Sequence, residues 1–164
     1  MDILVSVGAS EFALDRLLAI VDDLCNEGII DGNHVIAQTG SCNYTPKNFK
    51  AFKFISRDEY QVYMDKADVI ISHAGTGCVV PAIKMGKKVL VFPRRKEYKE
   101  HLDNHQLELA EVFSANGYTK TVNNKDELKD CLMNLDGFIP KPFISNKEKM
   151  NDLIIEYIES TFRK

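Results

Sequence analysis

The stretch from Ile70 to Cys78 reads IISHAGTGC, an apolar run that ends at a serine and a histidine and continues into two glycines. With Val69, its first residues form a short, continuously apolar segment, which is typical of a strand covered on both faces. Gly75 and Gly77 then allow positive φ and let a ligand approach the backbone amides without a Cβ in the way. Two interpretations of this loop stay open: a tight turn that reverses the chain, and a cradle for an anion.

Strand-like and helix-like segments alternate on both sides of this stretch. Besides 69–71, apolar runs predict strands at 3–7, 34–37, 49–55, 89–92 and 118–122. Helices are expected at 12–24, 57–66, 78–85, 104–115, 125–135 and about 145–163. This alternation predicts an α/β fold, a doubly wound and mostly parallel sheet with helices on both faces.

Capping residues and one proline bear on where these helices begin. Three helix starts have capping signals: Ser56 with Glu59, Asn124, and Ser145 with Glu148. Pro81 falls inside the helix expected at 78–85, and its missing N–H is tolerable only in the first turn. We therefore expect Pro81 to lie in that turn.

The length and charge of the chain limit its class. Its 164 residues, 45% hydrophobic and 27% charged, suffice for one core and fall short of two full α/β domains, so one domain is expected over 1–164. A net charge of −3 leaves no excess of basic residues to neutralise phosphates along a groove, which argues against a nucleic-acid binder. The opening MDILVSVGAS does not resemble a signal peptide, and no run reaches the roughly 18 apolar residues of a membrane span. We expect a cytoplasmic protein.

Cysteine and histidine spacing does not indicate a metal site. The four cysteines are far apart and form no C-x-x-C pair, which indicates isolated reduced thiols. His101 and His105 are four residues apart and would share a helical face, but no third acidic or sulfur ligand is suggested near them. We therefore expect neither a metal ion nor another cofactor.

Three polar loops follow predicted strands. In doubly wound sheets, ligands bind at the carboxyl ends of the strands, where the strand order reverses. The loops are GASEF (8–12), SHAGTGC (72–78) and PRRKEYKEHLDNHQ (93–106). The helix after the second loop would present unpaired N–H groups and the positive end of its dipole to a diphosphate. The spacing is G-x-G without the third glycine of a dinucleotide fingerprint, and no P-loop motif is present.

The third loop offers two kinds of ligand group. Four basic residues would contribute to a phosphate field or form a solvated basic loop: Arg94, Arg95, Lys96 and Lys99. Four others place donors and acceptors at a helix start, as recognition of sugar hydroxyls requires: Asp103, Asn104, His105 and Gln106. Asn104 would also serve as the N-cap of that helix, and the two roles are compatible.

Taken together, three segments resemble a known family. VSVGASEF (5–12), ADVIISHAGTGC (67–78) and KKVLVFPRRKEYKEHLDNHQLELA (87–110), with a closing helix, resemble the C-terminal, nucleotide-sugar-binding half of family 28 glycosyltransferases. The chain is more closely similar to small soluble subunits of split enzymes, both bacterial exopolysaccharide subunits and the eukaryotic subunit making dolichol-linked chitobiose. The combination of H-A-G-x-G with N-H-Q is the most specific part. The resemblance implies one Rossmann-like domain, the C-terminal half of a GT-B enzyme.

The resemblance also implies binding roles for particular residues. The UDP diphosphate would lie against one loop: Gly75, Thr76, Gly77 and the amide of Cys78, with His73 shaping the turn. The donor sugar and its phosphate would face Asn104, His105 and Gln106. The uracil would meet backbone groups of Phe54 and Ile55, and the glycine-rich first loop near the acceptor side corresponds to Gly8 and Ser10.

Two positions depart from the family pattern. Cys78 stands where family members commonly have serine or threonine, and Pro81 stands where many have a glutamate for the ribose hydroxyls. A thiol is a poor hydrogen-bond donor and proline offers no carboxylate. Nucleotide affinity or donor choice would therefore differ from the family.

The implied activity is inverting transfer of a hexose from a UDP-sugar to a lipid-linked acceptor, in exopolysaccharide or capsule synthesis. One domain has room for the donor only, so a membrane-associated partner subunit would supply the acceptor site and hold the chain at the inner face of the membrane. Backbone amides, the helix dipole and Arg94 or Arg95 would stabilise the leaving group, since no D-x-D motif is present for a metal. The general base stays unassigned; Glu11 is the only carboxylate of the first loop, and solvation at the surface is its alternative.

Other interpretations stay open beside this one. In one, the chain is a non-catalytic enhancer of its partner. In the other, it is a domain that binds another nucleotide. The apolar face of the last helix, over 150–158, would dock the partner or pack on the sheet of the chain itself.

Overall fold

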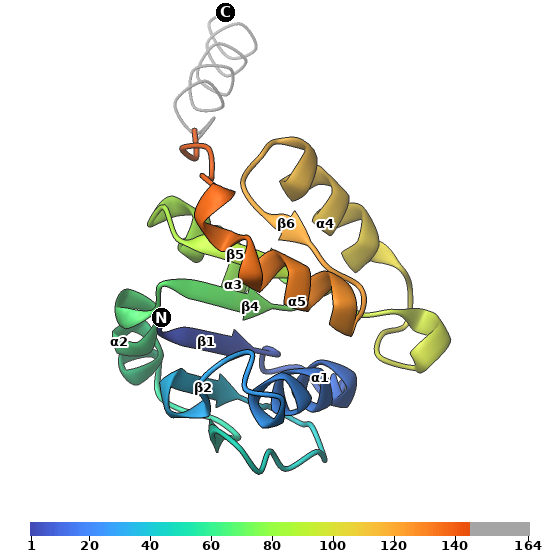
Figure 1. The fold of residues 1–164 in the computed structure, drawn as a ribbon. Coiled ribbons are helices and arrows are strands. Elements are labelled where there is room, and N and C mark those ends of the chain that lie inside the picture. The colour runs from blue at the N-terminus through green and yellow to red at the C-terminus, as the bar shows by residue number, and fades with distance from the viewer. Residues whose placement is uncertain (145–164) are drawn as a thin grey trace, which may run out of the picture.

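Six strands form one sheet in the computed structural model, which describes residues 1–144 (Figure 1). The strands are β1 (Ile3–Ser6), β2 (Val35–Gln38), β3 (Lys50–Phe52), β4 (Val69–Ser72), β5 (Lys88–Val91) and β6 (Lys120–Thr121). Their spatial order is β3-β2-β1-β4-β5-β6, and every neighbouring pair runs parallel. The predicted α/β fold is confirmed, with a sheet that is parallel throughout the described residues.

Helices alternate with these strands along the chain. The α-helices are α1 (Asp15–Asn26), α2 (Arg57–Lys66), α3 (Thr76–Lys84), α4 (His105–Ala115) and α5 (Lys125–Met133), with short 3-10 turns at Gly32–His34, Lys96–Tyr98 and Leu135–Gly137. Across residues 1–144, no helix has both the length and the apolar character that a membrane crossing demands. The helix predicted at 145–163, with its capping box and its docking face, lies outside the described residues.

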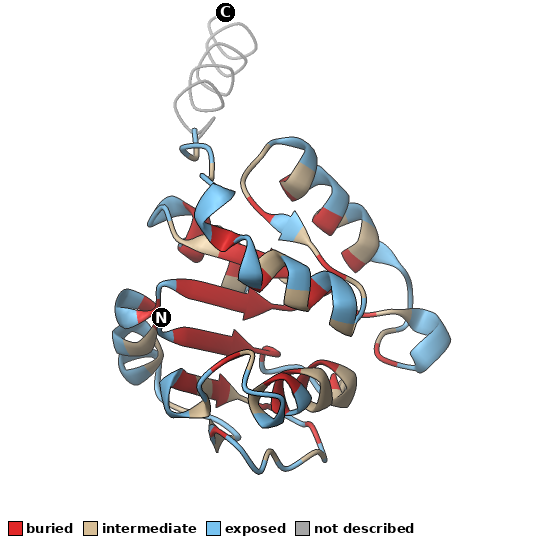
Figure 2. Ribbon diagram, in the orientation of Figure 1, coloured by how far each residue is buried: buried red, intermediate tan, exposed pale blue. Residues whose placement is uncertain are grey.

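The helices cover both faces of the sheet because strand side chains alternate between two apolar clusters. One cluster joins the strands to α1 and α5, through residues such as Val5, Ile71, Leu18 and Leu128. The other joins them to α2, α3 and α4, through residues such as Leu4, Ile70, Met64, Val79 and Phe113. Figure 1 shows α1 and α5 in front of the sheet and α3 behind it, and Figure 2 shows the central strands buried between these layers.

The strand order reverses between β1 and β4, the two central strands. They pair in register from Ile3 opposite Val69 to Ser6 opposite Ser72, so both strands end at the same height. The chain then leaves β1 toward α1 on one face and β4 toward α3 on the other. The GASEF and SHAGTGC loops therefore begin side by side, at the place where doubly wound folds bind ligands.

Local capping signals placed two helices correctly. Ser56 and Glu59 form the reciprocal capping box of α2, in which the Glu59 N–H donates to Ser56 Oγ at 3.2 Å. Asn124 caps α5 by accepting a hydrogen bond from the Glu127 N–H at 2.9 Å. The strands β3 and β6 are shorter than predicted, because each lies at an edge of the sheet and pairs with one neighbour only.

The start of α3 differs from the prediction. The helix begins at Thr76 rather than Cys78, so Pro81 lies in its interior and not in the first turn. Because proline has no N–H, the carbonyl of Gly77 lacks its usual helical partner. Gly77 and Pro81 are both exposed, so solvent can reach that carbonyl and satisfy it.

Candidate functional site

The imidazole ring of His73 lies between the first and second loops, beyond the ends of β1 and β4. A Cβ atom at Gly8 would lie 2.6 Å from His73 Cε1, and one at Gly75 would lie 2.1 Å from His73 Nε2. Any larger residue at either position would have to displace the ring. The packing of this histidine therefore explains why both loops carry glycine where they meet.

The backbone conformation of the glycines corrects one prediction. Gly8 has a φ of 79°, in the left-handed region, but Gly75 has a φ of −77° and Gly77 lies within α3. The positive φ expected at 75 and 77 is therefore wrong; Gly75 is required by the His73 ring instead. Apart from its chain neighbours and the backbone of α3 itself, a Cβ at Gly77 would have no heavy atom of the described chain within 4 Å, so this position faces open space that a ligand can occupy.

Burial keeps the His73 ring neutral at pH 7. The residue is 7% exposed, and its Nδ1 lies 3.4 Å from both the Ser6 carbonyl oxygen and Ser72 Oγ. Burial, together with the positive charge of nearby Arg94, lowers the pKa of His73 to about 4. A neutral imidazole brings no charge to an anion, so the geometry gives this ring the task of shaping the turn.

The N-terminus of α3 opens toward the same edge. Thr76 and Gly77 are its first residues, both are exposed, and no side chain caps the helix. The first N–H groups of a helix have no partner within it, and the helix dipole adds partial positive charge there. The Cys78 N–H, which we also expected at the diphosphate, instead donates to the Gly75 carbonyl at 3.0 Å. The Cys78 Sγ lies 3.5 Å from Ser6 Oγ, so the residue type at position 78 affects a contact inside the chain.

Arg94 differs most from its expected place. We expected Arg94 either to contribute to a phosphate field or to be solvated in a basic loop, yet its side chain is buried, with 2% of the residue exposed. Its Nη2 donates to the carbonyls of Val7 and Phe12, both at 2.7 Å, and its Nη1 donates to Ser10 Oγ at 3.0 Å. Burial lowers the pKa of Arg94. The guanidinium holds the first loop in an irregular conformation, and α1 begins only at Asp15 instead of residue 12.

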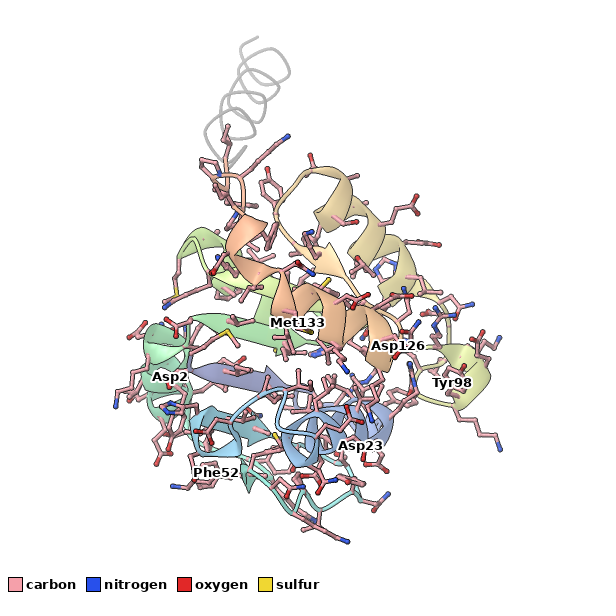
Figure 3. All side chains as sticks on the ribbon, in the orientation of Figure 1. Asp2, Asp23, Phe52, Tyr98, Asp126 and Met133 are labelled. Carbon is pink, nitrogen blue, oxygen red and sulfur yellow. The ribbon has the colours of Figure 1, made fainter. Side chains whose placement is uncertain are left out.

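A second arginine fixes the loop after β5. Arg16 forms a two-point ion pair with Glu100, with both N–O distances 2.9 Å, and its guanidinium lies 4.6 Å from the ring centre of Tyr98, which Figure 3 labels. Glu100 is 6% exposed and also accepts from the Arg95 N–H at 3.0 Å. The Arg95 side chain pairs with Glu97 at 3.1 Å. The basic loop is therefore partly neutralised by its own carboxylates.

The N-H-Q segment divides between the surface and the interior. Gln106 is 7% exposed, and its Oε1 accepts from the Arg94 N–H at 3.1 Å. Asn104 occupies the N-cap position of α4, but its side chain accepts from the Lys96 N–H at 3.1 Å and does not cap the helix. The expected capping hydrogen bond is therefore wrong. Asn104 and His105 are exposed and accessible to a ligand.

The other predicted residues lie at the margins of this edge. Ser10 and Glu11 are exposed in the first loop, Phe54 is 58% exposed, and Ile55 is half-buried. A cavity of about 270 Å³ lies between the loop after β2 and the end of β3, and its lining reaches Lys53, the residue before Phe54. The binding roles of these residues stay predictions.

The two histidines of the third loop do not face a common ligand. His101 Nδ1 lies 3.0 Å from Asp103 Oδ1, which also accepts from the His105 N–H at 3.0 Å. Within residues 1–144, no group of three or more His, Cys, Asp or Glu side chains is arranged to hold a metal ion. The cysteines there are all free thiols.

Sequence reasoning missed three polar side chains behind the loops. Ser6 and Ser72 are fully buried, and Ser72 Oγ donates to the Ser6 carbonyl at 3.0 Å. The Tyr60 hydroxyl, from α2, is buried and has no hydrogen-bond partner within residues 1–144. The serines had a signal, because Ser72 ends an apolar run and Ser6 interrupts one, whereas nothing in the pattern of α2 singles out Tyr60.

Comparison with known proteins identifies the family. Residues 2–157 match the family model of the glycosyltransferase family 28 C-terminal domain. The chain belongs to this family. Two relatives are the human and mouse UDP-N-acetylglucosamine transferase subunit ALG13, 32% identical over 124 residues and 30% over 122. These matches cover 71% and 70% of this chain but only 10% of each relative, so the family 28 chain spans about a tenth of their length.

Solved structures share the fold. An NMR solution structure of ALG13 has a TM-score of 0.60 at 23% identity, covering 94% of this chain and 95% of that one. UDP-GlcNAc 2-epimerase from Neisseria meningitidis, bound to UDP-GlcNAc, has a TM-score of 0.57 at 15% identity, covering 98% and 44%. The family 28 domain therefore has the Rossmann-like fold predicted from its sequence, that of the C-terminal half of a GT-B glycosyltransferase.

Proposed function

We propose that this family 28 domain is a glycosyltransferase subunit that binds a UDP-sugar and passes the sugar to a lipid-linked acceptor, in exopolysaccharide or capsule synthesis. One observation carries the proposal: the uncapped N-terminus of α3, with open space at Gly77, lies where the strand order reverses. The names of the curated relatives support UDP-N-acetylglucosamine as the donor.

The donor would lie across the carboxyl edge of the sheet. Its diphosphate would accept hydrogen bonds from the amides of Thr76 and Gly77, which begin α3 and have no side-chain cap. Its sugar would face the exposed side chains of Asn104 and His105 at the start of α4. Its uracil would lie near Phe54 and Ile55, beside the cavity that Lys53 helps to line.

The transfer would invert the configuration at the anomeric carbon. An acceptor hydroxyl attacks that carbon on the face opposite UDP, the bond to the β-phosphate oxygen breaks, and UDP leaves with the electron pair. The amides and dipole of α3 stabilise the charge that develops on UDP. The proton of the hydroxyl needs a general base, supplied by Glu11, which is exposed in the first loop, or by the partner.

A partner subunit would complete the enzyme. The described residues form a single sheet with one edge suited to the donor, and a GT-B reaction needs a second surface for the acceptor. The partner would provide that surface and the membrane association that a lipid-linked acceptor requires. The relatives are themselves named as subunits, which supports this division of labour.

Calorimetric titration with UDP, ADP and GDP tests the donor site. We expect wild type to bind UDP selectively and Gly77→Val to lose this binding, because the valine side chain would fill the open space at the start of α3. Gly137→Val is the matched control, since a Cβ at Gly137 also has no neighbour within 4 Å but lies away from the site. Equal binding of all three nucleotides would indicate a general nucleotide-binding domain.

A second experiment separates a catalytic subunit from an enhancer. In the complex with its partner, His105→Ala should abolish most turnover while complex formation is retained. His105 is preferable to Gln106 for this purpose, because Gln106 is buried and holds the backbone of Arg94. Unchanged turnover in His105→Ala would support the enhancer role.

A further inference from the structure

Three arginines and two carboxylates meet behind the carboxyl edge of the sheet, and their charges do not balance. Arg16 forms a two-point ion pair with Glu100, and Arg95 forms an ion pair with Glu97. Within residues 1–144, Arg94 has no carboxylate among its hydrogen-bond partners, which are two carbonyls and a hydroxyl. Its Nε is buried and has no partner at all in the described chain.

Such a charge is costly to bury. An ionised group removed from water is destabilising unless an opposite charge and hydrogen bonds compensate it. Arg94 is 2% exposed, and a guanidinium stays protonated at any ordinary pH. The carboxyl edge of the sheet therefore carries a fixed positive charge with no counter-charge in contact among the described residues; Glu100, which is paired with Arg16, attracts it only from a distance.

The guanidinium of Arg94 also orients a backbone hydrogen-bond donor, the Gly8 N–H. The peptide that joins Val7 to Gly8 is trans, so the Gly8 N–H points opposite to the Val7 carbonyl and away from Arg94. This N–H has no acceptor within residues 1–144. Gly8 contacts the same His73 ring as Gly75, so the donor lies near the start of α3. A cation behind the peptide strengthens its N–H as a hydrogen-bond donor.

We propose that Arg94 is a positioning residue for the phosphate groups of the ligand. Its buried charge, held behind the first loop, raises the affinity of this edge for an anion by acting through that loop and without touching the ligand. Its backbone N–H, bonded to Gln106, ties the same residue to the start of α4. The inference rests on the proposed function, because it assumes a nucleotide diphosphate at the start of α3.

Titration by NMR with UDP, uridine and inorganic pyrophosphate tests the inference on the full chain. We expect Arg94→Met to weaken UDP and pyrophosphate about tenfold, because a unit charge several ångströms from an anion contributes on this scale at a protein surface. Uridine, which has no phosphate, should bind as in wild type. Arg94→Lys keeps the charge and should stay within about threefold of wild type for UDP. Lys125→Met is the matched control, since it removes a positive charge that Asp23 and Glu27 already neutralise and that has no role in the proposed site.

The outcomes separate this inference from the proposed function. Equal weakening of UDP and uridine in Arg94→Met would mean a merely structural role, and unchanged binding of UDP would mean none; either result overturns the inference alone. If thermal unfolding shows that Arg94→Met does not fold, Arg94→Lys decides, because a loss of more than about tenfold for UDP in the folded lysine variant would contradict a role of charge. If pyrophosphate binding depends on Arg94 but the calorimetric titration shows equal binding of UDP, ADP and GDP, the UDP-sugar donor is overturned while the role of Arg94 toward a diphosphate stands. Failure of wild type to bind UDP and pyrophosphate would overturn both.

Discussion

The amino and carboxyl ends of the strands form two opposite sides of the sheet, the amino edge and the carboxyl edge. Both carry a histidine and a charged side chain, which are exposed at the amino edge and buried at the carboxyl edge. At the amino ends of the strands, Asp2 Oδ1 and His34 Nδ1 are 2.6 Å apart, and both side chains are more than half exposed. At the carboxyl ends, His73 and Arg94 are almost completely buried. Figure 3 shows Asp2 and Tyr98 at opposite ends of the molecule, each marking one of these edges.

The two edges differ in what stabilises their polar groups. Water solvates the exposed pair at the amino edge, so its partners can be exchanged at little cost. The buried groups at the carboxyl edge need nearby backbone atoms, so they dictate the glycines and loop conformations around them. A cavity of about 160 Å³ lies at the amino ends of the strands, lined by residues that include Asp2, His34 and Tyr63, yet none of the described residues that line it has a buried charged side chain. A hollow alone is weaker evidence of function than a buried polar arrangement.

Acid should reveal the largest difference between the edges. The pKa of His73 is about 4 in the folded chain, against an ordinary value of 6.5, so between these pH values the unfolded chain binds the extra proton. The contribution of His73 to stability is therefore complete above pH 6.5 and decreases as the pH falls toward 4, by up to about 3 kcal/mol. Urea unfolding at pH 7 and pH 4.5 should show that His73→Asn loses less stability in acid than wild type.

The exposed histidine provides the control for this experiment. His34→Asn should lose as much stability in acid as wild type, because His73 is still present in that variant. Identical losses in wild type and His73→Asn would contradict the assignment of the effect to the buried ring.

A methyl group at Gly75 should have the next largest effect. We expect Gly75→Ala to lower the free energy of unfolding by about 1–3 kcal/mol, because its Cβ would lie 2.1 Å from His73 Nε2. Gly77→Ala, two residues later in open space, should be neutral or slightly stabilising within the helix. Thermal unfolding of the two variants measures the difference.

A double variant identifies the ring as the obstacle. Gly75→Ala should cost much less when His73→Ala has already removed the imidazole, so the two changes should not be additive. The same cost in both backgrounds would mean that something other than the ring requires glycine at 75.

The smallest effect is expected at the amino edge. Asp2→Asn removes the carboxylate that pairs with His34, and because both side chains are exposed, salt should screen what stability the pair provides. Unfolding at low and high salt should show a small difference from wild type that disappears as salt is added. An effect as large as that of Gly75→Ala would break the contrast between the two edges.

Local patterns predicted much of the fold. The run at 69–71 makes up three of the four residues of β4, Ser56 with Glu59 begins α2, and Asn124 begins α5, because each of these signals acts within a few residues. Alternation of strands and helices was enough to predict the doubly wound sheet and to place the polar loops at its carboxyl ends. The strand order itself was not predicted, because it depends on which apolar faces pack together in three dimensions.

The details of the site required the structure. Nothing in the neighbourhood of Arg94 in the sequence shows that its partners are Val7, Ser10 and Phe12, and a basic loop gives no sign that one of its arginines is buried. The glycine at 75 suggested a turn with positive φ, whereas the requirement comes from the ring of His73. Residue types at the site were found from sequence; their contacts were not.

The contacts of Arg94 also set the order in which the site can be completed during synthesis. They join it to residues that precede it by 82 to 87 positions, and the serines that end β1 and β4 are 66 positions apart. A growing chain therefore exposes the first loop long before the arginine that holds it has been made. A product that stops before residue 94 contains the whole H-A-G-T-G motif but lacks the guanidinium that donates to the carbonyls of Val7 and Phe12. The set of contacts that hold the first loop is therefore complete only after residue 94 has been made.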